Sequence, residues 1–382
     1  MWNWKSSRAW AAAPGFPRLR WAVRRLLCTY SSVDGRLVRA APPWRILFFG
    51  TDAFSQWILQ TLHRRSSLQE GKLLIERLEV VTLPTMKSGD FPVRKYAKMN
   101  QISVHDWPYF TEHSHFDVGI IVSFGALLSD ALIRQFPYGI LNLHPSLLPR
   151  WRGPAPIFHT LIHGDQVTGV TVMQIRPRRF DVGPILMQQE CPVPPRCTSD
   201  ELGVILADKG AEMLWSLLKS LPEHIENKWQ QSKEGITFVL VPAAPKITVA
   251  DSWVNWEEQT VEELDRLHRA IGSRVPLRTL WMGKTVKLME LVDAEETPDL
   301  RAAKQEQFIP GTVYFQKESD VLLVRCKNGW TGFKQVVLKK LLSAADFYNG
   351  YLHPYFQGSA VFQNVARFQT YTPKTKFFKR PK

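Results

Sequence analysis

Residues 141–153, with the sequence LNLHPSLLPRWRG, set the interpretation of the whole chain. Asn142 and His144 alternate with Leu141 and Leu143, so on a β-strand the two polar side chains would share one face. A proline follows directly and ends the strand. An amide next to an imidazole at a strand end predicts an opening into a site. A strand whose Asn and His merely find backbone partners has the same local pattern.

Short apolar runs alternate with helix-like segments on either side of this stretch. The runs are WRILFFG at 44–50, LEVVTLP at 78–84 and VGIIVSF at 118–124. Continuous apolar runs are typical of parallel strands buried on both faces, and the alternation predicts a Rossmann-like open parallel α/β sheet. Ligands of such sheets bind at the carboxyl ends of the strands, so Gly50, Ser123 and His144 are expected to converge there. No G-x-G-x-x-G follows the first strand, so a dinucleotide site is not indicated.

A carboxylate completes a candidate catalytic group. Asp181 lies in an Asp-Val-Gly turn between two further predicted strands, a place where Asp often serves only the turn. Beside a histidine, however, a carboxylate favours the protonated ring and orients it, while an amide and a cationic ring stabilise a developing oxyanion. No Ser or Cys occurs in a nucleophile motif, so Asn142, His144 and Asp181 fit direct acyl-group transfer better than covalent catalysis.

Composition limits the class of protein. The 382 residues predict two or three domains, and 45% hydrophobic with 22% charged residues is ordinary for a globular protein. A net charge of +14 suits a polyanionic partner such as nucleic acid or an anionic membrane surface. The sequence contains no run of about 18 uninterrupted apolar residues, so no membrane-spanning helix is expected. The four cysteines form no C-x-x-C pair, so neither a disulfide framework nor a metal site is expected.

The amino terminus has the pattern of a targeting segment. Residues 1–33 contain six Lys and Arg residues, and no acid precedes Asp34. An Arg-rich, acid-free start with no long apolar core predicts a mitochondrial transit peptide, which we assign to residues 1–43. A basic arm that binds RNA is the alternative interpretation.

The remaining chain predicts a catalytic domain at 44–221, a linker at 222–250 and a second domain at 251–360. After one amphipathic helix, the second domain reads as short strand pairs separated by polar turns, which suggests a small β-barrel. The tail, residues 361–382, is basic and carries interleaved aromatic residues such as Phe368 and Tyr371. That pattern suits phosphate contact and base stacking, although a frayed tail would also show it.

The motifs together resemble a known family. The run NLHPSLLPRWRGPAPI at 142–157, with the later Asp-Val-Gly turn, resembles the signature of the folate-dependent formyltransferases. These enzymes transfer a formyl group from 10-formyltetrahydrofolate to an amine, without a metal. The resemblance implies that Asn142, His144 and Asp181 are catalytic. It places contacts to the folate donor at Ser146, Leu147, Leu148 and Pro149 and at Phe124, Gly125, Ala126, Leu127 and Leu128.

The form SLLPRWRG, with the opening FFGTDAFS, is more similar to the methionyl-tRNA formyltransferase branch than to the purine-pathway branch. The resemblance covers residues 44–345 and implies an OB-like second domain that holds methionyl-tRNA. It implies acceptor-stem contacts at Arg150, Arg152 and Lys87, unless the two arginines only anchor their loop. Together with the leader, the resemblance implies a location in the mitochondrial matrix. We expect the protein to be a monomer.

The selection of the tRNA and two rival functions stay open at this point. Bacterial members of the branch carry a longer basic insertion after the second strand, whereas the corresponding loop at 83–92 is short and offers only Lys87. The means of telling initiator from elongator tRNA is therefore in doubt. A formyltransferase acting on a small amine, or a non-catalytic RNA-binding protein of the same fold, remains a rival interpretation.

Overall fold

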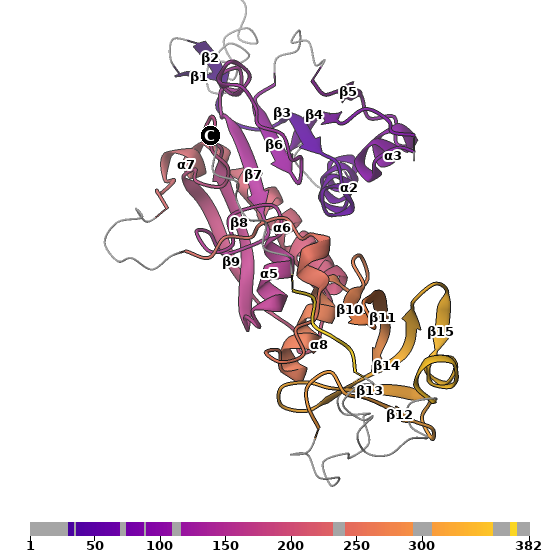
Figure 1. Cartoon of the computed structure of the whole chain (residues 1–382). Coiled ribbons are helices and arrows are strands. Elements are labelled where there is room, and N and C mark those ends of the chain that lie inside the picture. The colour runs from indigo at the N-terminus through magenta and orange to yellow at the C-terminus, as the bar shows by residue number, and fades with distance from the viewer. Residues whose placement is uncertain are drawn as a thin grey trace, which may run out of the picture.

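The computed structural model describes residues 30–33, 36–68, 74–87, 89–108, 116–231, 241–292, 308–353 and 367–372. Most of the predicted leader and the last ten residues of the basic tail lie outside the described residues. Figure 1 shows an α/β unit built from the N-terminal two thirds of the chain, beside a smaller unit of antiparallel strands. In the part of the chain that the structure describes, no helix is both long and apolar enough to cross a membrane.

A seven-stranded sheet forms the centre of the first unit. In spatial order its strands are β5 (Val104–Asp106), β4 (Ile75–Thr82), β3 (Trp44–Gly50), β6 (Val118–Val122), β7 (Ile140–His144), β8 (Val167–Gln174) and β9 (Ile185–Pro192). The first five strands are parallel, which confirms the predicted class. The last two are antiparallel, so the sheet is mixed rather than fully parallel. A short connection joins β8 to β9, and such a connection can only join antiparallel neighbours.

Both faces of the sheet are covered. On β3, Ile46 and Phe48 enter the larger core, while Leu47 and Phe49 enter a smaller cluster on the opposite face. The larger core is covered by the packed helices α2 (Ala53–Ser67) and α6 (Ser199–Lys219). The other helices of this unit are α3 (Pro92–Met99), α4 (Asp130–Ile133), α5 (Pro156–Ile162) and α7 (Leu221–Glu226). Burial on both faces explains why the strand sequences are apolar throughout.

The folded unit starts earlier than the sequence predicted. Residues 30–39 form a hairpin of β1 (Tyr30–Val33) and β2 (Arg36–Arg39). Val38 is part of the main core, and the Tyr138 hydroxyl donates to the Arg39 carbonyl at 2.7 Å. Packed residues therefore precede residue 44, and the leader boundary stays a prediction.

The second unit is a closed antiparallel sheet. Its strands are β10 (Leu277–Trp281), β11 (Lys284–Val292), β14 (Trp330–Val337), β13 (Val321–Arg325) and β12 (Val313–Gln316), with β15 (Leu341–Ser343) paired to β14. Before the sheet come η1 (Val249–Ser252) and α8 (Val261–Ile271), and after it α9 (Ala344–Phe347) and η4 (Tyr348–Leu352). Gln369 pairs with Leu280 of β10, and Arg367 pairs with Thr312 just before β12. Residues 367–369 thus join the two edges of the sheet, as a barrel requires.

This closure corrects one expectation about the tail. Phe368 is only 1% exposed and packs between Trp256 and Phe347, so it belongs to the core of the barrel. Tyr371 stacks on Trp253 with ring centroids 4.4 Å apart. The prediction that Phe368 is free to stack on a nucleic-acid base is therefore wrong. The basic residues after 372 lie outside the described residues.

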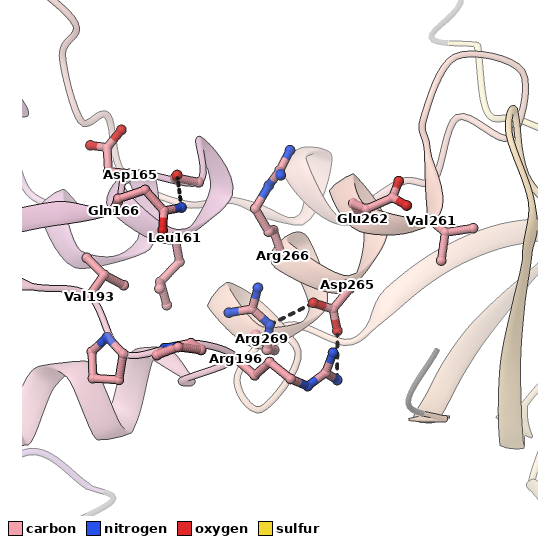
Figure 2. A pocket seen from close by; sticks show the side chains of 13 residues that line it. Leu161, Asp165, Gln166, Val193, Arg196, Val261, Glu262, Asp265, Arg266 and Arg269 are labelled. Atoms are coloured by element: carbon pink, nitrogen blue, oxygen red, sulfur yellow. Dashed lines mark hydrogen bonds and ion pairs between the residues drawn. The ribbon is translucent and has the colours of Figure 1, made fainter. Parts of the chain in front are cut away.

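The two units pack directly through α5 and α8. Asp265 of α8 pairs with Arg269 at 2.8 Å and with Arg196 of the α/β unit at 3.6 Å, and Arg269 also donates to the Cys197 carbonyl at 2.7 Å. Figure 2 shows Asp265, Arg269 and Arg196 at a cavity between the units. The volume of this cavity is about 260 Å³. Ion pairs and apolar contacts across this boundary give the second unit a defined place beside the first.

Candidate active site

Strand β7 positions the first two candidate catalytic residues. Leu141 and Leu143 enter the main core, whereas Asn142 and His144, on the other face, line a large cavity at the carboxyl edge of the sheet. This is the arrangement that the two-residue period of the strand predicted. His144 is 5% exposed, so its ring is largely withdrawn from solvent.

Asp181 reaches the same cavity from the connection between β8 and β9. Its φ of 53° is in the left-handed region, which Asp tolerates better than most residues. One carboxylate oxygen, Oδ1, accepts from Asn142 Nδ2 at 3.2 Å and lies 3.7 Å from His144 Nδ1. The other, Oδ2, accepts from the Gly153 backbone N–H at 2.9 Å. The predicted amide, imidazole and carboxylate are thus in one cluster, with Asp181 at its centre.

The backbone selects the tautomer of the histidine. His144 Nε2 lies 2.9 Å from the Trp151 carbonyl oxygen, which can only accept a hydrogen bond. Nε2 must therefore carry a proton, and Nδ1 is the nitrogen that faces Asp181 and can gain or lose one. Residues 151–153 consequently orient the histidine through the Trp151 carbonyl and the aspartate through the Gly153 N–H.

The cavity has a volume of about 930 Å³, within the range of sites for drug-sized molecules. The turn after β6 forms one side of it, with all five residues that the resemblance assigned to the folate donor there: Phe124, Gly125, Ala126, Leu127 and Leu128. The turn after β3 and the start of α2 also line it with Thr51, Asp52, Ala53, Phe54 and Trp57. Asp52 caps α2 by accepting from the Ser55 N–H at 2.9 Å.

The other predicted donor-binding segment lies outside the lining of this cavity. Ser146, Leu147, Leu148 and Pro149 are absent from the residues described as lining the cavity. The Ser146 hydroxyl donates to the Arg150 carbonyl at 2.8 Å, and Leu148 is buried against Met173 and Ile185. The chain turns away from the cavity after Pro145 and returns at Gly153. The SLLP segment therefore shapes the loop that orients His144 and Asp181, and its contact with the donor stays a prediction.

The two predicted tRNA-binding arginines both bind other side chains of the protein. Arg150 makes a bidentate pair with Asp165, with Nε–Oδ2 at 2.9 Å and Nη2–Oδ1 at 2.6 Å, and the bond to Asp165 raises the pKa of its guanidinium. Arg152 donates to the side-chain oxygen of Gln231 from Nε at 3.1 Å and from Nη2 at 2.6 Å. These contacts fit the anchoring role that the sequence left open, and contact of the two arginines with tRNA stays a prediction. Lys87 is exposed in a turn outside the cavity lining.

The linker contributes residues that the sequence did not reveal. Gln231 is 8% exposed, and its amide nitrogen donates to the carbonyls of Asp181 and Gly183, each at 3.0 Å. Its oxygen accepts from Arg152, so every hydrogen-bonding group of this side chain is used. A lone glutamine near a predicted linker carries no sequence signal of such a position.

The linker then crosses the catalytic loop a second time. The Trp151 N–H donates to the Pro242 carbonyl at 2.9 Å, and the Ala244 N–H donates to the Arg152 carbonyl at 2.7 Å. Gly153 has a φ of +123°, and a β-carbon there would lie 2.5 Å from the Ala244 carbonyl oxygen. The segment between the two units is thus paired with the loop that orients His144 and Asp181.

Among the described residues, no three potential ligands are grouped to hold a metal ion.

A mixed α/β sheet with an amide, an imidazole and a carboxylate at its carboxyl edge fits the group-transfer chemistry that the sequence predicted. A family model for formyl transferases matches residues 46–218, and one for their C-terminal domain matches residues 246–352. The human protein "Methionyl-tRNA formyltransferase, mitochondrial" is 50% identical over 98% of this chain and 94% of its own, and its bovine counterpart is 51% identical over 93% and 90%. The chain belongs to the methionyl-tRNA formyltransferase family.

A solved structure shares the fold at low sequence identity. HypX from Aquifex aeolicus in complex with tetrahydrofolic acid aligns with a TM-score of 0.52 and 17% identity, covering 81% of this chain and 47% of its own. At this identity the similarity concerns the fold alone.

Proposed function

We propose that this chain transfers the formyl group of 10-formyltetrahydrofolate to the α-amine of methionyl-tRNA, in the mitochondrial matrix. The observation that carries the proposal is the shared contact of Asn142 and His144 with one carboxylate oxygen of Asp181, inside a cavity large enough for a folate. Relatives whose names state this activity and this compartment match nearly the whole chain.

The proposed mechanism assigns each polar group a role. Asn142 uses one amide hydrogen on Asp181 and keeps the other for the formyl oxygen. His144, protonated at Nδ1, provides a second donor as that oxygen becomes negative, and the Trp151 carbonyl prevents the ring from turning. Asp181 stabilises the charged ring and accepts the proton of the attacking amine, which passes through water to N10 as the C–N10 bond breaks.

The turn 124–128 is our candidate for the donor side of the cavity. Phe124, Ala126 and Leu128 join the cluster around Phe49, and a β-carbon at Gly125 would meet no atom within 4 Å, so the backbone there is open to a flat ring. We assign residues 38–221 to the catalytic domain, 222–250 to the linker and 251–372 to the tRNA-holding barrel, in a protein that acts as a monomer.

A panel of acceptors tests this function. Purified protein with 10-formyltetrahydrofolate would be given methionyl-tRNA, free methionine, glycinamide ribonucleotide and an amino-sugar nucleotide. Transfer to methionyl-tRNA alone supports the proposal. Preferred transfer to a small amine would favour another formyltransferase activity, and tRNA binding without any transfer would leave an RNA-binding protein.

A further inference from the structure

The connection between β8 and β9 carries a basic hairpin at the mouth of the catalytic cavity. We define it as residues 176–180, with the sequence RPRRF. Arg176 and Arg179 pair across the turn, and Arg178 at its tip has a φ of 60°. All five residues are exposed, and the hairpin leads directly into Asp181. Three positive charges thus stand immediately before a catalytic carboxylate.

The arginines that line the cavity differ in how they are satisfied. Arg274 pairs with Asp200 at 2.9 Å and lies over the Phe158 ring at 5.1 Å. Arg176 donates to the side-chain oxygen of Gln230, a neutral partner that leaves its charge uncompensated. The Arg179 side chain has no hydrogen bond or ion pair within the described ranges. The hairpin side of the cavity therefore holds cationic charge that no described acidic residue pairs with.

An exposed aromatic ring accompanies this charge. Phe180 lines the cavity and is 57% exposed, although a ring of this size is usually buried where the fold permits. Arg178, at the tip, lies outside the cavity lining and also lacks a partner within the described residues. An unpaired guanidinium beside an open aromatic face provides phosphate contact and base stacking together, the combination that binds single-stranded nucleic acid.

The chemistry of the reaction determines which part of the acceptor is here. The attacking amine must approach Asp181, and in an aminoacyl-tRNA only the aminoacyl ester separates that amine from the terminal ribose. The terminal nucleotide must therefore lie beside the residues that adjoin Asp181. We propose that the hairpin binds the 3′-terminal nucleotides of the tRNA, with Phe180 stacked on a base and Arg178 and Arg179 on phosphates. This inference rests on the proposed function, and it adds a binding site that the motif did not contain.

Direct binding to two forms of the tRNA tests the site without catalysis. The Kd would be measured for full-length tRNA and for tRNA shortened by its 3′-terminal nucleotides, with wild type, Phe180→Ala and the double variant Arg178→Gln/Arg179→Gln. Arg134→Gln is the matched control, because it also removes an exposed guanidinium from the catalytic unit.

For full-length tRNA, we expect Phe180→Ala to weaken binding roughly 5- to 150-fold, the effect of losing one stacked base. The double variant should reduce the slope of log Kd against log salt by about 0.7 for each arginine. Neither variant should weaken binding of the shortened tRNA more than Arg134→Gln does. Equal losses for both tRNAs would overturn the proposal, since they would place the contacts away from the 3′ end.

Steady-state kinetics tests whether the hairpin binds the donor instead of the tRNA. The donor also carries carboxylates, so the KM for 10-formyltetrahydrofolate would be measured beside the KM for methionyl-tRNA. A rise in the tRNA KM alone supports the site. A rise in the donor KM with an unchanged tRNA Kd would overturn it and assign the hairpin to the donor. A wild type that binds tRNA through the hairpin but transfers no formyl group would refute the proposed function and leave this site intact.

Discussion

Replacing Gln231 with leucine should disturb the active site from a position that touches no substrate. The change keeps similar volume but removes both donors that hold the Asp181 and Gly183 carbonyls. A buried carbonyl without a partner costs about 1–3 kcal/mol, so the two together cost about 2–6 kcal/mol. We add nothing for Arg152, because its guanidinium is half-buried and can turn toward water.

Urea unfolding and single-turnover formyl transfer would be measured on the same samples. Part of the loss should appear as a lower free energy of unfolding. The rest should appear as a displaced Asp181 turn, and a displacement of about 1 Å lowers a transfer rate roughly 100-fold. Gln231→Glu should behave similarly, because its second oxygen would face the same two carbonyls.

Gln166→Leu is the control for Gln231→Leu. Gln166 is exposed, and its amide donates to the Gly164 carbonyl at 3.0 Å, so its loss should change neither measurement. If Gln231→Leu matched this control in both stability and transfer rate, the linker would have no part in orienting Asp181.

Three further predictions concern the loop, a thiol and an imidazole. Gly153→Ala should lower the transfer rate with little loss of tRNA affinity, because a β-carbon would lie 2.5 Å from the Ala244 carbonyl oxygen; rate and Kd measured together check this. Burial raises the pKa of the Cys326 thiol to about 12, so a thiol reagent at pH 8 should label it only after unfolding, and rapid labelling of the native protein would contradict that burial. Burial lowers the pKa of His268 from 6.5, so its stabilising contribution is present above that pH and is lost as the pH falls below it. Unfolding free energy measured from pH 8 to pH 5 should fall less for His268→Gln than for wild type.

The clustering of Asn142, His144 and Asp181 was predictable because it depends on short-range pattern. The alternation of Asn142 and His144 with leucines fixed their common face, and apolar strands located the sheet edge where Asp181 meets them. The two-residue period of a strand is a local property, so it can be recognised from the sequence alone.

The sequence is least informative where long-range contacts determine the outcome. Ser146 to Pro149 lie next to His144 in the sequence, yet the loop turns them away because Leu148 packs against β8 and β9. Phe368 reads as part of a basic tail, but it closes a barrel whose other strands lie far away in the sequence. Gln231 and Ala244 return to the catalytic loop only after the sheet has formed, and no local period marks them.

The same limit applies to Arg150. The family resemblance implied a phosphate contact, whereas in the structure its guanidinium pairs with Asp165. A motif identifies residues that belong together, but it does not say which of them face the substrate.

The most direct test of the proposed mechanism is the single-turnover rate of formyl transfer to methionyl-tRNA by Asp181→Asn. This substitution keeps the shape of the side chain and its contact with the Gly153 N–H, but removes the charge and the ability to accept a proton. The mechanism predicts a rate lower by about 10²–10⁴, with binding of both substrates unchanged. Transfer at the wild-type rate would show that the proton and the charge are handled elsewhere, and would contradict the central role of Asp181.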